Sequence, residues 1–87
     1  MRIDKYLKNA RLIKRRTIAK EACDQGRISV NGKVAKPGTE IKNGDIIEMT
    51  FSNRKITINV LSLEEHVTKD ISKMLYEIIS EDKINLE

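Results

Sequence analysis

The chain has 87 residues, one cysteine, one histidine and a formal net charge of +4 at pH 7. This length allows a single domain with a modest core. No stretch reaches the roughly 20 apolar residues that span a bilayer, and the charged start Met1–Lys5 lacks the apolar segment of a signal peptide. The single Cys23 excludes an internal disulfide and fits a reducing compartment. We therefore expect a cytoplasmic protein that does not enter membranes.

The positive charge is concentrated in the first part of the chain. Residues 1–60 contain 14 Lys and Arg against 6 Asp and Glu, whereas residues 61–87 contain 3 against 7. Like charges repel one another unless a polyanion lies beside them, which indicates a nucleic-acid partner. The candidate phosphate contacts near the N-terminus are Arg2, Lys5, Arg11, Lys14, Arg15, Arg16 and Lys20. The alternative is a basic face that only keeps the protein soluble.

Two short helices are expected at the start of the chain. Asp4 can cap a first helix, and a second helix is expected from about Arg16 to Gln25. The apolar residues of the second helix recur at helical spacing and share one face: Ile18, Ala19, Ala22 and Cys23. Gly26 stands where a C-terminal helix cap is expected.

Short strands separated by polar turns are expected from Arg27 onward. Asn31-Gly32, placed between two alternating segments, is a strong hairpin signal. Further turns are expected at Pro37-Gly38, Asn43-Gly44-Asp45 and Ser52-Asn53, around strands at residues 46–51 and 55–60. Two helices followed by four or five strands predict an α+β fold with a small, mostly antiparallel sheet.

The last segment has the spacing of an amphipathic helix. Its apolar residues lie at i, i+4, i+7, i+8, i+11 and i+12: Val67, Ile71, Met74, Leu75, Ile78 and Ile79. Ser62 and Glu65 have the spacing of a capping box at or before its start. This interpretation divides the chain into a domain of residues 1–61 and a helical, acidic segment of residues 62–87, frayed after Glu81. The helix either completes the core or docks a partner, and the spacing leaves both open.

No constellation of catalytic or metal-binding residues is visible in the sequence. His66 stands alone in an acidic stretch, and one histidine with one cysteine cannot complete a structural zinc site. Cys23 belongs to an apolar helix face, which favours a buried and inert thiol. The four glycines occur singly in turns and form no nucleotide-binding loop. We therefore expect no catalysis, no metal and no cofactor.

The few aromatic residues indicate which nucleic acid is bound. Only Tyr6, Phe51 and Tyr76 are present, so the stacking platforms on which single-strand binders depend are missing. This favours recognition of the backbone of folded RNA. A DNA-binding helix-turn-helix is the weaker interpretation, because the second helix is short of Asn and Gln for base edges. A protein-interaction module is the remaining alternative.

The order of these residues resembles the S4 RNA-binding domain. The resemblance covers about residues 1–60, and the matching segments are 2–7, 11–12, 14–19, 26–33, Lys36 and Gly44-Asp45 before an apolar strand. It implies the S4-like (alpha-L) fold, in which short N-terminal helices pack on a small curved sheet. The chain length and the run Leu12–Thr17 are most similar to the free-standing S4 proteins of ribosome-associated quality control. Many S4 domains have serine where Arg15 stands, so the cap of the second helix differs here.

The resemblance also implies partners and contact residues. Such proteins bind the obstructed large ribosomal subunit, where they lie against 23S rRNA and peptidyl-tRNA and work with an RqcH-type protein during alanine tailing. Arg2 and Arg16 would be the chief RNA contacts, Lys36 a further one, and the turn Asn31-Gly32 would lie near phosphate. Asp4 would orient a neighbouring arginine. A monomer is expected, and ribosome assembly or tRNA chaperoning are the alternative roles.

Overall fold

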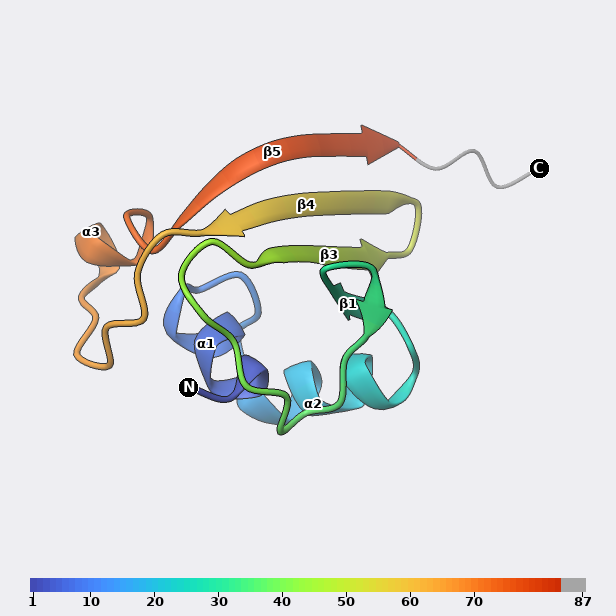
Figure 1. Ribbon diagram of the computed structural model, residues 1–87, viewed down its shortest axis with the longest axis horizontal. Helices are drawn as coiled ribbons and strands as arrows, with labels where there is room; N and C mark the ends of the chain where they lie inside the picture. Colours follow the sequence, from blue (N-terminus) through green and yellow to red (C-terminus); the bar gives the residue numbers. More distant parts are fainter. Residues whose placement is uncertain (84–87) are drawn as a thin grey trace.

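The computed structural model describes residues 1–83, which form three helices and one five-stranded antiparallel sheet (Figure 1). The helices are α1 (Ile3–Asn9), α2 (Arg16–Asp24) and α3 (Lys69–Ser72). The strands are β1 (Ile28–Val30), β2 (Lys33–Val34), β3 (Ile46–Phe51), β4 (Arg54–Val60) and β5 (Tyr76–Lys83). Their order in the sheet is β2-β1-β3-β4-β5. The predicted α+β class is confirmed.

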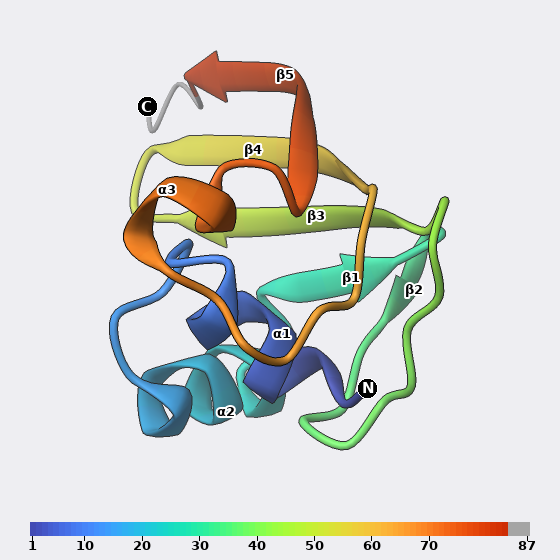
Figure 2. The ribbon, with the colours of Figure 1, turned by 90° about the vertical axis from the view of Figure 1, so that its left-hand side faces the viewer.

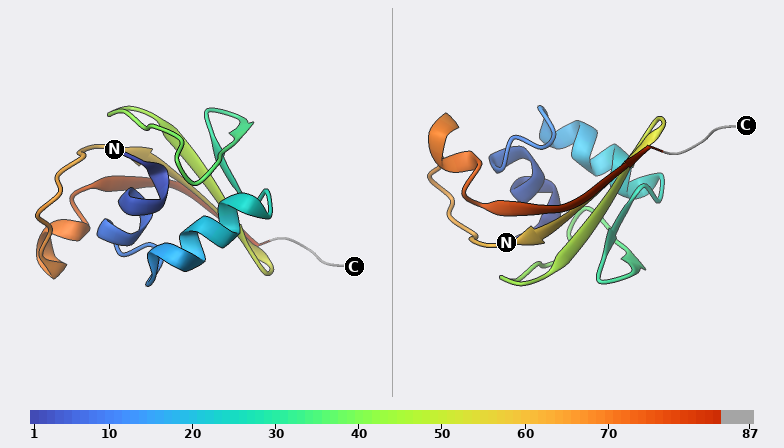
Figure 3. Two further views of the ribbon diagram at one scale, coloured as in Figure 1. Left: turned by 90° about the horizontal axis from the view of Figure 1, so that it is seen from below. Right: turned by 90° about the horizontal axis from the view of Figure 1, so that it is seen from above.

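The core lies between the sheet and the first two helices, which cover one of its faces (Figures 2 and 3). Strand residues that point toward the helices, such as Ile47, Met49 and Ile58, are fully buried. The helices contribute Ile3 and Tyr6, also fully buried. Each such side chain stabilises the fold by about 1.5–3 kcal/mol. Because one face of each helix is used in this way, its opposite face is left to solvent. No helix in the described part of the chain could span a lipid bilayer.

Helix α2 agrees with the sequence prediction except at one residue. Ala19, Ala22 and Cys23 are buried, at the i, i+3, i+4 spacing of a single helix face. The prediction that Ile18 shares this face is wrong, because Ile18 is 45% exposed. The buried stripe of a two-turn helix is narrow, and a residue one position earlier lies about 100° away from it. Gly26 follows the helix with a φ of +74°, as expected for a C-terminal cap.

The hairpin predicted at Asn31-Gly32 is confirmed. Both residues have positive φ, +51° and +85°, which is the requirement of a tight turn that matches the twist of its strands. The turn aligns β1 with β2 so that Val30 lies opposite Lys33. β1 then pairs with β3, and β3 with β4 over six residues. The strands expected at 46–51 and 55–60 are therefore also confirmed.

The amphipathic helix predicted for the C-terminal segment is wrong. Only the four residues of α3 are helical, and the apolar run that follows forms β5, which pairs with β4 from Val60–Tyr76 to Arg54–Lys83. Tyr76, Ile78 and Ile79 are residue types that favour strands. Without β5, the backbone N–H and C=O groups on the outer edge of β4 would have no partner in the sheet, and a strand can pair with them whereas a helix cannot. The pairing carries a bulge between Thr57 and Ile58.

The cap and the boundary predicted for that helix change accordingly. The cap is Thr68, whose Oγ1 accepts a hydrogen bond of 3.3 Å from the Ile71 amide, and not Ser62 with Glu65. β5 extends past Glu81 to Lys83, so the fraying expected there is wrong for those two residues, and residues 84–87 lie outside the described part. The domain boundary predicted after residue 61 stays a prediction. β5 lies in the same sheet as β1 to β4, which precede that boundary.

Candidate RNA-binding surface

Asp4 is a buried carboxylate that holds two arginines of the predicted surface. Its side chain is 3% exposed, and its Oδ2 atom lies 3.2 Å from Nη2 of Arg2 and 3.3 Å from Nε of Arg16. Its Oδ1 atom accepts a hydrogen bond of 2.8 Å from the Lys5 amide. The N-cap position belongs to Arg2 instead, so Asp4 is not the cap residue that was predicted. Its predicted role in orienting an arginine is confirmed, for two arginines rather than one.

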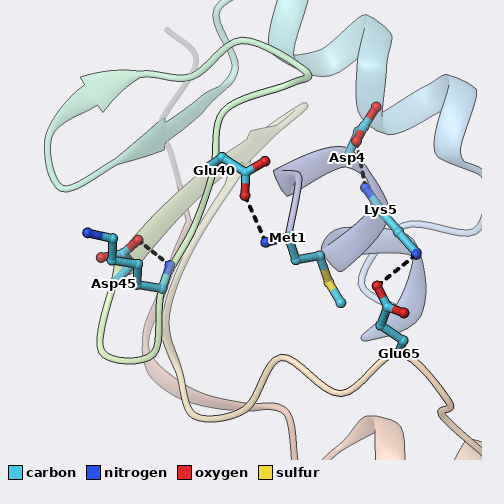
Figure 4. Close-up of polar contacts among 7 residues, drawn as sticks. Met1, Asp4, Lys5, Glu40, Asp45 and Glu65 are labelled. Atoms are coloured by element: carbon cyan, nitrogen blue, oxygen red, sulfur yellow. Dashed lines mark hydrogen bonds and ion pairs between the residues drawn. The ribbon is translucent and has the colours of Figure 1, made fainter.

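The start of the chain is fixed by the loop that leads to β3. The amides of Ile3 and Asp4 donate hydrogen bonds to the carbonyls of Thr39 and Pro37, at 2.8 and 3.3 Å. The N-terminal ammonium of Met1 pairs with Glu40 at 2.8 Å, as Figure 4 shows. Arg2 lies between these anchors, so its backbone is held on both sides.

The same loop contains Lys36 and supports the Arg2 side chain. A Cβ atom added to Gly38 would lie 3.8 Å from the Arg2 guanidinium. The Lys36 amide donates 2.9 Å to Oγ1 of Thr39, and this turn presents the Lys36 side chain to solvent. The structure therefore places Lys36 in the same loop as Gly38, which lies next to the Arg2 guanidinium.

Three cations meet at a hollow of about 280 Å³ between the start of α1 and α2. We call it the Arg16 hollow, and its lining residues are Arg2, Asp4, Arg16, Thr17 and Lys20. Arg16 and Lys20 share this side because they stand one helical turn apart. Arg2 and Arg16 are each 47% exposed, so their guanidinium groups are held by Asp4 and still reach solvent. A fixed fork of this kind suits a phosphate.

A second hollow, of about 290 Å³, lies where α1 ends. We call it the Lys14 hollow, and its lining residues are Lys8, Asn9, Arg11, Ile13, Lys14, Glu65 and Val67. It contains the predicted contacts Arg11 and Lys14. Sequence reasoning missed Lys8 and Asn9. Lys8 stands three positions after the candidate Lys5 and three positions before Arg11. This helical spacing is the sequence signal that could have identified Lys8 as part of the basic surface.

Lys5, another predicted contact, is paired with an exposed carboxylate from a segment far along the chain. Its Nζ atom lies 3.1 Å from Oε1 of Glu65, in the segment that crosses α1 on its way to α3 (Figure 4). This hydrogen bond and the Lys5 charge hold the pKa of Glu65 below its usual range, so the carboxylate is ionised at neutral pH. Both side chains are exposed to water, so the pair adds little to stability.

The remaining predicted contacts lie outside both hollows. Arg15 is exposed and precedes α2. The Asn31 side chain is engaged within the protein, because Oδ1 accepts from the Ile46 amide at 3.0 Å and Nδ2 donates to Asp45 at 3.1 Å. Asn31 therefore ties the hairpin to the turn before β3, and the exposed backbone of the Asn31-Gly32 turn is the part that is available to a phosphate.

The described residues hold no cluster of three or more His, Cys, Asp or Glu side chains that could bind a metal. Cys23 is buried, and burial raises the pKa of its thiol to about 11. The thiol is therefore protonated at neutral pH, which agrees with the expected inert cysteine. The surface offers exposed cations, two of which, Arg2 and Arg16, are held in place by Asp4.

Comparison with known proteins identifies the family of the chain. The S4 domain matches residues 1–47. The chain is 49% identical to the RQC P-site tRNA stabilizing factor of Halalkalibacterium halodurans, over 98% of this chain and 97% of that protein. It is 49% identical to the protein of the same name from Listeria monocytogenes, over 95% of this chain and 90% of the relative.

Among solved structures, the trimeric heat shock protein 15 of Vibrio cholerae is similar to this fold. The TM-score is 0.85 at 26% identity, over 92% of this chain and 82% of that chain. The resemblance noted in the sequence is thereby confirmed. The chain belongs to the S4 domain family.

Proposed function

We propose that this protein is a non-enzymatic RNA-binding factor of ribosome-associated quality control, acting in the cytoplasm as a monomer. It binds the large ribosomal subunit that still carries peptidyl-tRNA, contacts 23S rRNA and the tRNA, and supports alanine tailing of the stalled chain with an RqcH-type protein. The observation that carries the proposal is the pair of exposed guanidinium groups, Arg2 and Arg16, held by the buried carboxylate of Asp4. The names of its relatives support the quality-control context.

The contribution of such a factor is binding energy. A protein that contacts both the subunit and the tRNA stabilises the arrangement in which the two are correctly placed, and so raises its population. The contact residues that we propose are Arg2, Lys5, Arg11, Lys14, Arg15, Arg16, Lys20, Lys36 and the backbone of the turn Asn31-Gly32. Most of their affinity comes from neutralised phosphates, so binding weakens as salt is added.

The test is co-sedimentation of Arg16→Ala with large subunits that carry peptidyl-tRNA. We expect the affinity to fall about tenfold or more, because a hydrogen-bonded charge contributes about 1.5–3 kcal/mol. Asp4 keeps Arg2 as its partner, so circular dichroism and the urea midpoint are expected to stay close to those of the wild type. Arg54→Ala is the matched control, since Arg54 is an exposed arginine on β4, outside both hollows.

A second measurement separates quality control from the alternative roles. Tagged protein is purified with its bound particles, and their RNA is analysed for peptidyl-tRNA. Large subunits that carry peptidyl-tRNA support the proposal. Immature subunits without tRNA would favour an assembly factor, and free tRNA would favour a tRNA chaperone. Equal co-sedimentation of Arg16→Ala and Arg54→Ala would contradict the proposal itself.

A further inference from the structure

The two edge strands of the sheet differ in length and in what they present to solvent. β2, at one edge, has two residues, whereas β5, at the other edge, has eight. A very short edge strand is one of the means by which proteins prevent further strand pairing, and β5 lacks this protection. Within residues 1–83, β5 pairs with β4 and with no other strand. One row of its backbone N–H and C=O groups is therefore free to pair with an added strand.

The start of β5 exposes apolar side chains that the core does not use. Ile78, Ile79 and Met74 are each more than half exposed. A hollow of about 330 Å³ adjoins the start of the strand, and we call it the Met74 hollow. Its lining residues are Ser62, Glu64, Ile71, Met74 and Leu75. Neighbouring apolar side chains that remain in water mark interaction sites, and a flexible methionine adapts to the shape of a partner.

The charge of β5 determines which kind of segment it attracts. The strand carries Glu77, Glu81 and Asp82 against a single lysine, Lys83. Glu81 lies 3.6 Å from Arg54 of β4, whereas Glu77 and Asp82 form no ion pair within residues 1–83. Opposite charges on neighbouring strands attract and like charges repel. A strand that carries Lys or Arg is therefore favoured at this edge.

The same charge disfavours RNA and a second copy of this chain. The acids of β5 repel phosphates, and two β5 strands paired edge to edge would bring together the three acids and one lysine of each copy. The Arg16 hollow lies between the helices, at the opposite end of the molecule from β5 (Figures 1 and 2). A protein bound to β5 therefore leaves the Arg16 hollow open.

We propose that β5 binds an extended, basic segment of another protein, which joins the sheet as a further strand. Backbone hydrogen bonds along β5 supply the affinity that is common to strand addition, and side-chain contacts supply selectivity. Lys or Arg side chains of the segment lie beside Glu77 and Asp82, and one of its apolar side chains enters the Met74 hollow. This inference goes beyond the proposed function and does not depend on it.

The first test identifies what lies against β5 in living cells. The photo-crosslinking amino acid benzoylphenylalanine replaces Ile79 in the full chain, and mass spectrometry identifies the cross-linked molecule. Ile79 is the extra residue of the β5 bulge, so the replacement removes no cross-strand pair with β4. The same replacement at Val34, exposed on the opposite edge strand β2, is the matched control. We expect Ile79, and not Val34, to cross-link to a protein segment with an excess of Lys and Arg.

The second test measures binding with purified components. A synthetic peptide of the cross-linked segment is titrated into the full-length protein, and fluorescence anisotropy gives the dissociation constant. Glu77→Lys/Asp82→Lys turns two attractive pairs into repulsive ones, and we expect it to weaken binding about tenfold. Ile79→Lys is also expected to weaken binding, whereas Val34→Lys on β2 is not. Circular dichroism verifies that each variant is folded.

Hydrogen exchange distinguishes strand addition from attachment through side chains alone. The outer amides of β5 gain hydrogen bonds when a strand is added, so their exchange is expected to slow when the peptide binds, while exchange in β2 stays unchanged. Unchanged exchange in β5 with a bound peptide would contradict strand addition.

Other outcomes would also overturn the proposal. Cross-links from Ile79 to RNA would make β5 part of the RNA-binding surface, and cross-links to a second copy would make it a contact between copies. Cross-linking no stronger than at Val34 would show that the edge stays unpaired. Equal weakening by Val34→Lys and the β5 variants would place the peptide elsewhere. The proposed function is tested separately, by Arg16→Ala and its binding to large subunits.

Discussion

The hydroxyl of Tyr6 donates a hydrogen bond of 2.6 Å to the carbonyl of Leu75, and so joins α1 to the residue that precedes β5. Both residues are fully or almost fully buried. Burial raises the pKa of Tyr6 well above its usual range, so the hydroxyl remains a donor at every physiological pH. The C-terminal strand is thus fastened to the helix that carries the candidate surface.

Removing this hydroxyl is expected to destabilise the fold. Tyr6→Phe leaves the Leu75 carbonyl buried without its donor, which costs about 1–3 kcal/mol. Urea denaturation followed by circular dichroism measures the free energy of unfolding. Tyr76→Phe is the control, since Tyr76 is only half-buried. A change of the same size in both variants would show that the Tyr6 bond contributes nothing specific.

Asp4→Asn is expected to weaken RNA binding although it makes the protein more positive. The neutral amide no longer holds the Arg2 and Arg16 guanidinium groups, so they lose the fixed geometry described above. We expect affinity for large subunits to fall severalfold. Asp24→Asn is the control, because it changes the net charge equally at an exposed position. If both variants bind more tightly, charge alone governs affinity and the orientation by Asp4 is irrelevant.

Glu65→Gln is expected to strengthen RNA binding. The substitution frees Lys5 to meet a phosphate, so the salt slope becomes steeper by about 0.7–0.9. The urea midpoint at neutral pH should change little because the pair is exposed. Glu77→Gln on β5 removes the same charge at a distance from α1. An equal gain in both variants would attribute the effect to net charge.

The same pair predicts a small pH effect on stability. The pKa of Glu65 is lower in the folded than in the unfolded protein, so its contribution is present above the unfolded pKa and is lost as the pH falls through the folded one. We expect urea midpoints measured between pH 5 and 3 to show this loss of stability for the wild type and not for Glu65→Gln. An unchanged series would show that the Lys5 contact is not formed in solution.

Two isoleucines test the strand assignment of the C-terminal segment. Ile58 is fully buried in β4, between Ile47 and Ile78 of the adjoining strands, whereas Ile79 is 53% exposed. Ile58→Ala should lower the free energy of unfolding by about 2–5 kcal/mol. Ile79→Ala should change it by about 0.5 kcal/mol or less. A large loss for Ile79→Ala would mean that this residue is buried, as in the amphipathic helix predicted from the sequence.

The elements with local signals were predictable, and those that depend on distant partners were not. The Asn31-Gly32 turn and the Gly26 cap follow from residues that tolerate positive φ. Ile71 to Ile79 fits both a helical stripe and a short apolar strand, and only the unpaired edge of β4 decides between them.

The candidate surface shows the same limit. The cluster of cations is evident in the sequence, and the family resemblance singles out Arg2 and Arg16. The Lys14 hollow could not be found in this way, because it depends on Arg11 adopting positive φ, which nothing about an arginine indicates. The engagement of the Asn31 side chain by Asp45 and Ile46 is likewise a long-range contact without a local signal.

Strand β5 and helix α2 lie at opposite ends of the molecule in Figures 1 and 2. The exposed cations of the two hollows lie on the side of α1 and α2 and give that side a positive field, which attracts a polyanion before the surfaces touch. Under the proposed function, the rate constant for association with the ribosomal particle therefore falls as added salt screens this field.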